Sequence, residues 1–194
     1  MRYVLFLILL GVFTSTLSGQ DTENSLIDKK EQRKLAREHR QAEKQAEALK
    51  KKQQVAELID SHRFVLKANY INGSRGERQV VSSNLNFIII DSTEATIQLG
   101  SGWGIGYNGV GGITVDGRIT KFEVNKKESK KGVSYSVTVY ILSGIGQYDV
   151  QFWISQNGSA NATVRGNYPG SVTYSGDIVA LKEARIYKAQ PIVP

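Results

Sequence analysis

Apolar and polar residues alternate along most of the chain from His62 onward. Successive side chains of a β-strand point to opposite faces of a sheet, so each alternating run predicts a strand with one apolar face. The pattern predicts a mainly β domain over residues 62–188, followed by a short tail over residues 189–194. The predicted strands comprise residues 64–70, 85–89, 95–99, 122–124, 133–141, 148–154, 160–164 and 172–180.

The connections between these runs are short and contain turn residues. Asn157-Gly158 is typical of a hairpin turn, as is Asp116-Gly117, and residues 126–132 predict a charged hairpin tip. Strands joined in this way lie antiparallel to each other. Eight consecutive antiparallel strands with one apolar face form either a closed barrel or two packed sheets, and the up-and-down order favours an eight-stranded, lipocalin-like β-barrel.

The inward-facing stripes combine aromatic residues with small ones at Ala160, Ala162 and Gly176. The small residues either leave space for a small apolar ligand or let the barrel taper around a filled core, which is the commoner arrangement in small barrels. For the first arrangement, the expected ligand-binding residues are Tyr70, Phe87, Phe122, Tyr135 and Phe152 in the lining, with Trp103 and Tyr107 at the mouth.

Some apolar residues fall on the otherwise polar face of the predicted strands, and something is expected to cover them. We expect the apolar end of the preceding segment, at Val55, Leu58 and Ile59, to dock there, and a protein partner is the alternative. The residues of this outer patch are Val65, Ile88, Ile90, Tyr140, Trp153 and Val179.

Residues 20–61 predict one long charged helix, because residues 25–60 contain neither glycine nor proline and are rich in strong helix formers. Apolar residues recur every seventh position from Leu35 to Ala56, but the companion positions are His39, Ala46, Gln53 and Asp60, so the seam is half polar. A coiled coil needs both core positions apolar. We therefore favour a solvated helix over self-association through a coiled coil.

The net charge of the chain is +7, and the helical segment contains the run Lys50-Lys51-Lys52. Glutamates are interspersed with the basic residues throughout this segment. Mixed charges at helical spacing are typical of a solvent-facing helix with ion pairs along it. We therefore expect no binding of nucleic acid.

Residues 1–19 have the pattern of a cleaved signal peptide: Arg2, an apolar run from Val4 to Val12, and small residues before Gly19. That run is too short to anchor the chain in a bilayer, and we expect no transmembrane segment after cleavage. The sequence predicts an exported protein, periplasmic or extracellular. The chain contains no cysteine, which excludes disulfides and thiolate metal sites.

The stretch Gly104-Ile105-Gly106-Tyr107-Asn108-Gly109 has the spacing of a dinucleotide-binding turn. Such a turn needs a helix after the glycines to receive the phosphates. Residues 113–117 instead predict a hairpin, so we expect no nucleotide cofactor. The segment is interpreted as a glycine-rich loop at the barrel mouth, acting either as a movable lid or as a plug that never opens.

Catalytic chemistry has little support in this sequence. The two histidines, His39 and His62, are not at metal-ligand spacing, and no nucleophile-elbow motif occurs. Acidic residues at turns and on polar faces leave a paired-carboxylate site open, although solvated carboxylates are the usual case there. We therefore expect no catalytic residues, no metal site, no cofactor and no enzymatic activity.

Four ordered segments are similar to a known family: "FVLKANYI", "ATIQLGSGWGIGYNGVGGI", "VQFWISQNGSANATV" and "SVTYSGDI". From Phe64 to Ala184 the chain resembles the exported proteins, mostly from Bacteroidetes, grouped as domain of unknown function 4251. The family's segment before the glycine loop has an aromatic residue and a proline, and Leu99-Gly100-Ser101-Gly102 stands there in this chain. The resemblance implies a lipocalin-like barrel in the periplasm and no established activity.

Two functions follow from these features. The first is a binding protein that holds a small apolar or amphipathic ligand inside the barrel. The second is a cell-envelope interaction protein that binds a protein partner or a surface through the charged helix or the outer face of the barrel.

Overall fold

The computed structural model of the chain describes residues 20–101, 106–130, 132–167 and 169–192. The predicted signal peptide and Trp103 lie outside these ranges. The described part of the chain divides into two units, with the boundary between Ala46 and Glu47.

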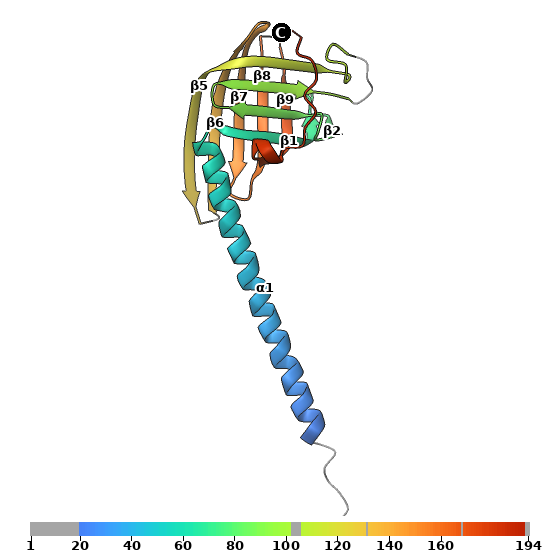
Figure 1. Cartoon of the computed structure of the whole chain (residues 1–194), viewed down its shortest axis with the longest axis vertical. Coiled ribbons are helices and arrows are strands. Elements are labelled where there is room, and N and C mark those ends of the chain that lie inside the picture. The colour runs from blue at the N-terminus through green and yellow to red at the C-terminus, as the bar shows by residue number, and fades with distance from the viewer. Residues whose placement is uncertain (1–19, 102–105, 131, 168, 193–194) are drawn as a thin grey trace, which may run out of the picture. The chain divides into compact units, whose positions relative to one another are not determined.

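The long charged helix is confirmed as α1 (Gln20–Asp60) (Figure 1). In the first unit, the side chains of residues 31–46 are all exposed, including that of Leu35. The Nδ1 atom of His39 lies 3.3 Å from a carboxylate oxygen of Glu43 one turn later, as expected for side chains four residues apart on a helix. Across the described residues, no helix is both long and apolar enough to cross a membrane.

The second unit is built around an antiparallel β-barrel (Figure 1), and its sheet runs in the order β2-β1-β3-β4-β5-β6-β7-β8-β9. Pairing of β1 with β9 closes the sheet into a barrel. The strands are β1 (Arg63–Asn72), β2 (Arg78–Val80), β3 (Phe87–Asp91), β4 (Glu94–Leu99), β5 (Ile113–Ser129), β6 (Gly132–Ser143), β7 (Gly146–Ser155), β8 (Ser159–Arg165) and β9 (Ser171–Val179), followed by the short helix η1 (Leu181–Glu183).

The barrel has eight strand positions, although the chain forms nine strands. β3 pairs with Arg63–Lys67 of β1 and β2 pairs with Tyr70–Asn72 of the same strand. Both pair along the edge of β1 that faces away from β9, so they fill a single position in the barrel wall. The predicted eight-stranded, up-and-down barrel is therefore confirmed.

The predicted turn at Asp116-Gly117 is wrong, because both residues lie inside the 17-residue strand β5. Gly117 pairs with Ala95 of β4. A Cβ atom on Gly117 would stand 2.6 Å from a methyl group of Ile141 on β6, so glycine here allows close strand packing rather than a turn. The turn at Asn157-Gly158 is confirmed, with the Gly158 N–H donating to the Ser155 carbonyl at 2.9 Å. At the predicted charged tip, the strands themselves run on to Ser129 and Gly132.

The end of α1 packs against the interior of the barrel and not against its outer face. Val55 and Ile59, one helical turn apart, are fully buried in the same cluster as Phe64 and Phe152. The predicted docking of the helix end on the outer patch is therefore wrong. The open end of a barrel exposes the apolar side chains of its interior, and burying those side chains together with the helix removes both from water.

The strand β3 faces the opposite way from its predicted orientation. Ile88 and Ile90 belong to the interior cluster, whereas Phe87 and Ile89 lie in a second cluster outside the barrel. Residues 87–90 are all apolar, so the alternation that assigns a face is missing there. The prediction of Phe87 as a lining residue is wrong for this reason.

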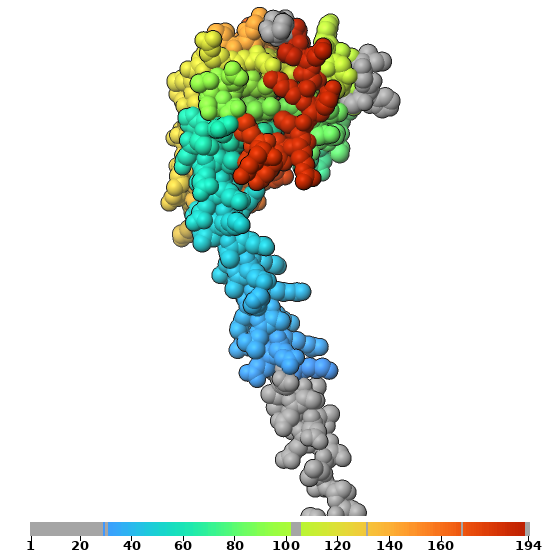
Figure 2. Space-filling model, viewed as in Figure 1, coloured from blue at the N-terminus to red at the C-terminus, as the bar shows by residue number. Residues whose placement is uncertain are grey.

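A C-terminal strap, residues 181–192, covers this second cluster (Figure 2). Ala184 is buried against Val65 and Phe87. Farther along the strap, the Tyr187 N–H donates to the carbonyl of Asn84 at 2.9 Å, and the Ile192 N–H donates to that of Thr114 at 3.1 Å. Of the predicted outer patch, Val65 and Val179 lie in the cluster that this C-terminal segment covers, whereas Trp153 remains exposed.

Candidate functional site

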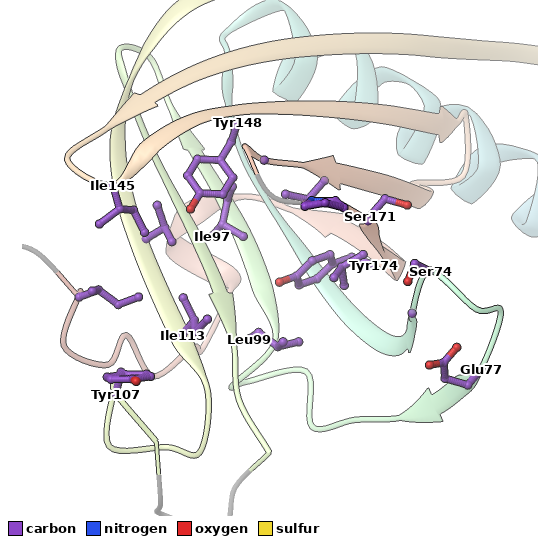
Figure 3. Close-up of a pocket in the computed structure, with 18 residues that line it drawn as sticks. Ser74, Glu77, Ile97, Leu99, Tyr107, Ile113, Ile145, Tyr148, Ser171 and Tyr174 are labelled. Carbon is purple, nitrogen blue, oxygen red and sulfur yellow. The ribbon is translucent and has the colours of Figure 1, made fainter.

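A pocket of about 660 Å³ opens at the end of the barrel opposite the end of α1 (Figure 3). The turn after β1, the end of β4, the start of β5 and the start of β9 all meet there. Most side chains in the lining are apolar or aromatic. They include Ile97, Leu99, Ile113, Val115, Ile145, Val164, Val172 and Ile192, the tyrosines Tyr107, Tyr148 and Tyr174, and the polar residues Ser74, Glu77 and Ser171.

Strict alternation on β4 and β5 places the apolar side chains in the pocket. Ile97 pairs with Val115 and Leu99 pairs with Ile113, so these four side chains face inward together. The intervening pair, Gln98 and Thr114, faces the opposite side of the sheet.

The side chain of Gln98 connects the outer side of the pocket wall to the strap. It is fully buried, its amide nitrogen donates to the Tyr187 carbonyl at 2.9 Å, and its amide oxygen accepts from the Ala189 N–H at 2.8 Å. The Thr114 hydroxyl donates to the same oxygen at 3.1 Å. A buried polar network in which each group has a hydrogen-bond partner is rigid, so it holds the pocket wall in one arrangement.

Tyr174 is the most buried aromatic residue of the pocket. Its side chain is 2% exposed, and its hydroxyl donates to the Gln98 carbonyl at 3.3 Å. Burial raises the pKa of the Tyr174 phenol above its ordinary value, because the surroundings disfavour the phenolate. The group therefore remains a neutral hydrogen-bond donor at physiological pH. In Figure 3, Ile97, Tyr148 and Tyr174 point into a common space, while Tyr107 and Glu77 lie toward the periphery.

The glycine-rich loop reaches the rim of the pocket and is anchored by a buried asparagine. The Asn108 amide nitrogen donates to the Leu99 carbonyl at 3.2 Å, and its amide oxygen accepts from the N–H groups of Val110 and Gly112 at 3.1 and 3.0 Å. The loop continues directly into the strand β5. The helix that a dinucleotide turn requires is therefore replaced by a strand.

Of the residues predicted to bind a ligand, Tyr107 contributes to the pocket. Its side chain is 87% exposed at the rim. Trp103, predicted beside it, lies outside the described residues.

The other predicted residues lie away from this pocket. Tyr135 and Phe152 are buried in the interior cluster, where the Phe152 ring meets Phe64 edge to face. Phe122 stacks on His62, with ring centroids 3.9 Å apart, near the end of α1. Tyr70 faces outward beneath the guanidinium of Arg78.

The small residues fit the second of the two predicted alternatives, a barrel that tapers around a filled core, because Ala160 and Ala162 are buried in the interior cluster. Ala162 pairs with Tyr174, and Ala160 pairs with Gly176, across β8 and β9. A Cβ atom on Gly176 would stand 1.9 Å from the Lys67 carbonyl oxygen, beside the irregularity in the β1–β9 pairing. The glycine allows the two backbones to approach and adds no volume to the pocket.

Ile113 and Val115 were missed because residues 113–117 were interpreted as a hairpin. Their alternation with Thr114 and Asp116 is the signal that identifies them as strand residues with an inward face. The polar side chains at the rim come from separate segments, with Ser74 and Glu77 on the turn after β1 and Ser171 at the first position of β9. Within the described ranges, no group of three His, Cys, Asp or Glu side chains is placed to hold a metal ion.

Comparison with known proteins gives a family and a fold. The family model described as "Domain of unknown function (DUF4251)" matches residues 46–178. Among solved structures, a DUF4251 family protein from Bacteroides eggerthii DSM 20697 is similar, with 23% identity and a TM-score of 0.55 over 69% of this chain and 89% of that chain. A search of curated proteins gave no match.

Proposed function

The chain belongs to the DUF4251 family, a domain family of unknown function, and we propose that it binds a small apolar or amphipathic molecule in the open end of its barrel. The observation that carries the proposal is the pocket of about 660 Å³ with its mainly apolar lining. Pockets for small molecules commonly have volumes of roughly 300–1,000 Å³, with a few polar groups that orient the ligand.

The arrangement of the lining fits a ligand with two chemically different ends. Ile97, Val115 and Val164 are almost fully buried, and would contact an apolar body. Ser74 and Glu77 on the turn after β1, and Ser171 at the start of β9, lie at the rim and would contact a polar end. An apolar body transferred into such a pocket gains about 25 cal/mol per Å² of surface removed from water.

We propose binding without catalysis. The polar groups of the lining are hydroxyls and the single carboxylate of Glu77. Acid–base chemistry ordinarily uses a positioned pair of groups with shifted pKa values. The Tyr174 phenol is held neutral by burial and its hydroxyl is engaged with the Gln98 carbonyl.

We also propose that the protein is exported to the periplasm or the extracellular space. The support is the pattern of residues 1–19, with a positive charge, an apolar run and small residues before Gly19. Expression with a reporter fused after residue 60, and N-terminal sequencing of the exported product, test this. A fusion protein that stays in the cytoplasm and keeps residues 1–19 would contradict this proposal.

Native mass spectrometry of the purified protein, with and without organic extraction, tests ligand binding. We expect a retained small molecule that extraction removes. Val164→Phe fills the pocket from β8, and Thr163→Phe adds the same side chain on the opposite face of that strand as the matched control. The proposal predicts loss of the bound molecule in the first variant only; equal retention in both would contradict it.

A second candidate function is contact with a protein partner or an envelope surface through α1. Its support is the exposure of residues 31–46 throughout their length. Crosslinking in cells with the whole chain, and with a chain lacking residues 21–46, tests it. The deletion ends before Val55 and Ile59, so the barrel keeps the side chains that bury its interior. An unchanged set of crosslinked partners would contradict this candidate.

A further inference from the structure

The outer face of β7, β8, β9 and β1 carries one continuous row of side chains in register. Trp153 pairs with Asn161, Asn161 pairs with Ser175, and Ser175 pairs with Tyr70. On the other side of Trp153, the row continues to Ser136 of β6. Across four adjacent strands, two aromatic residues are thus separated by the amide of Asn161 and the hydroxyl of Ser175.

The next row across the same face is uncharged too. Gln151 pairs with Thr163, Thr163 pairs with Thr173, and the two threonine hydroxyls are 3.0 Å apart. Solvent-facing strand positions usually carry many lysines and glutamates, as on β5, where Lys121 and Glu123 form an ion pair at 2.6 Å. The two rows on β7–β9 differ from this in offering only neutral donors and acceptors.

Both aromatic residues of the first row are accessible to a ligand. Trp153 is 46% exposed and Tyr70 is 36% exposed. The guanidinium of Arg78 lies 3.8 Å from the centroid of the Tyr70 ring, which orients the ring and adds N–H donors beside it. Three strand spacings of about 4.8 Å separate the two aromatic residues, or roughly 14 Å along the sheet.

The surface is hollowed on both sides of Asn161. One hollow, of about 670 Å³, is lined by Trp153, Ser136 and Asn161. The other, of about 430 Å³, is lined by Tyr70, Ser175 and Asn161. A ligand that contacts both aromatic residues must follow the curve of the closed barrel across these strands, with Asn161, which lines both hollows, between them.

We propose that this outer face binds a neutral glycan chain, with Trp153 and Tyr70 as stacking platforms and Asn161 and Ser175 as hydrogen-bonding groups. A sugar ring presents C–H groups on one face, which pack on the electron-rich face of an aromatic ring, and hydroxyls at its edge, which pair with amides and hydroxyls. The spacing between the platforms matches a chain of several sugar rings.

Other partners fit these residues less well. A protein interface generally has an apolar centre with a polar rim, whereas polar residues separate the two aromatic residues here. A nucleic acid or an acidic polysaccharide is bound through clustered cations. The two rows are uncharged, and the cations at their edges have acidic neighbours: Lys126 pairs with Glu128 at 2.8 Å, and Arg78 shares its hollow with Asp177, while Lys127 lines the other hollow. The face lies outside the barrel wall, so the inference is independent of the interior pocket.

Affinity electrophoresis in native gels that contain dextran, mannan, xylan or a soluble β-glucan tests the proposal, with heparin as the charged comparison. We expect at least one neutral polysaccharide to retard the protein, with Trp153→Ala weakening the affinity about tenfold or more, as for a central aromatic contact. Trp153→Tyr is expected to retain most of the binding because it keeps a platform. Tyr187→Ala, at an exposed aromatic residue of the strap, is the matched control and should change nothing.

Several results would overturn the proposal: no retardation by any of the four neutral polysaccharides, retardation by heparin alone, or equal retardation of Trp153→Ala and the unmodified protein. Circular dichroism establishes that each variant is folded, and Asn161→Ala provides a second test if Trp153→Ala is not. Val164→Phe, which fills the interior pocket, should leave the retardation unchanged. Loss of glycan binding in that variant would place the glycan in the pocket and overturn the outer-face proposal.

Discussion

The two ends of the barrel differ in what covers the apolar side chains of the interior. At one end, Val55 and Ile59 of α1 are buried against the interior and cover its apolar side chains. At the other end, the chain leaves a pocket lined by residues such as Ile97 and Val115. Covering one end with the helix removes apolar surface from water and stabilises the fold. The open end leaves apolar surface accessible, as in a pocket for a small molecule.

The largest expected effect comes from removing the cover at the closed end. Ile59→Ala deletes a fully buried side chain at a site with little room to collapse, and should lower the free energy of unfolding by about 4 kcal/mol. Urea denaturation measures this. Leu49→Ala, at an exposed leucine of the same helix, is the control and should change stability by less than about 0.5 kcal/mol. Similar losses in both variants would show that the helix end does not cover the barrel.

A matched deletion at the open end should cost less. Ile97→Ala removes the same atoms from a wall that already borders a pocket, so the transfer contribution of about 2 kcal/mol remains with little added cavity cost. The same urea experiment measures it. If Ile97→Ala is as damaging as Ile59→Ala, the pocket is filled in solution by side chains and the two ends do not differ.

Removing the Tyr174 hydroxyl, deep in the open end, should have a smaller effect on the free energy of unfolding, and this effect should depend on pH. Tyr174→Phe removes the hydrogen bond to the Gln98 carbonyl and should cost about 1 kcal/mol at neutral pH. The pKa of Tyr174 is raised in the folded state, so its contribution to stability is complete below about pH 10. As pH rises further, the unfolded chain loses this proton first and stability falls by about 1.4 kcal/mol per pH unit.

The Tyr174→Phe variant should lack this part of the alkaline decline. Denaturation midpoints measured between pH 8 and about pH 11 compare it with Tyr187→Phe, which changes an exposed tyrosine. An alkaline decline of the same steepness in both variants would mean that Tyr174 is not buried in solution.

The smallest effect is expected from the ion pair that joins the strap to β5 beside the open end. Lys188 lies 2.9 Å from Asp116, and both side chains are partly exposed. Lys188→Ala should lower stability by at most about 0.5 kcal/mol, because water and salt screen such a pair. Thermal unfolding at low and high salt measures it. A loss well above 1 kcal/mol would show that the strap depends on this pair more than on its buried apolar contacts.

The strands were predictable where the side-chain alternation was strict. Val133 to Ile141 on β6 is the longest such run, and each of its predicted inward residues is buried. The orientation of β3 was not predictable, because Phe87 to Ile90 are all apolar and both faces of that strand are covered. A single sequence does not reveal that the C-terminal strap covers the outer face of β3, where Ala184 packs in the same cluster as Phe87. The strap is distant in sequence, and its Ala189 N–H donates to the side chain of Gln98 on the neighbouring strand β4.

The candidate site was less predictable than the fold. Tyr107 was expected at the mouth from its place in the glycine loop, and it lies on the rim. Most of the large aromatic residues predicted as lining instead fill the half of the barrel nearer α1, as Phe152 does beside Phe64. Residue type indicates which side chains face inward, but the position along the barrel axis depends on strand register, which residue type does not give.

The seam between β1 and β9 has a consequence for how the molecule is made. Val65 at the start of the barrel pairs with Val179 near its end, so the wall cannot close until almost the whole chain has been synthesised. Contacts between such distant residues form slowly, because a long loop must be ordered before they stabilise anything. A growing chain of this topology therefore stays open for most of its synthesis, and its inward-facing apolar side chains stay uncovered until β9 pairs with β1.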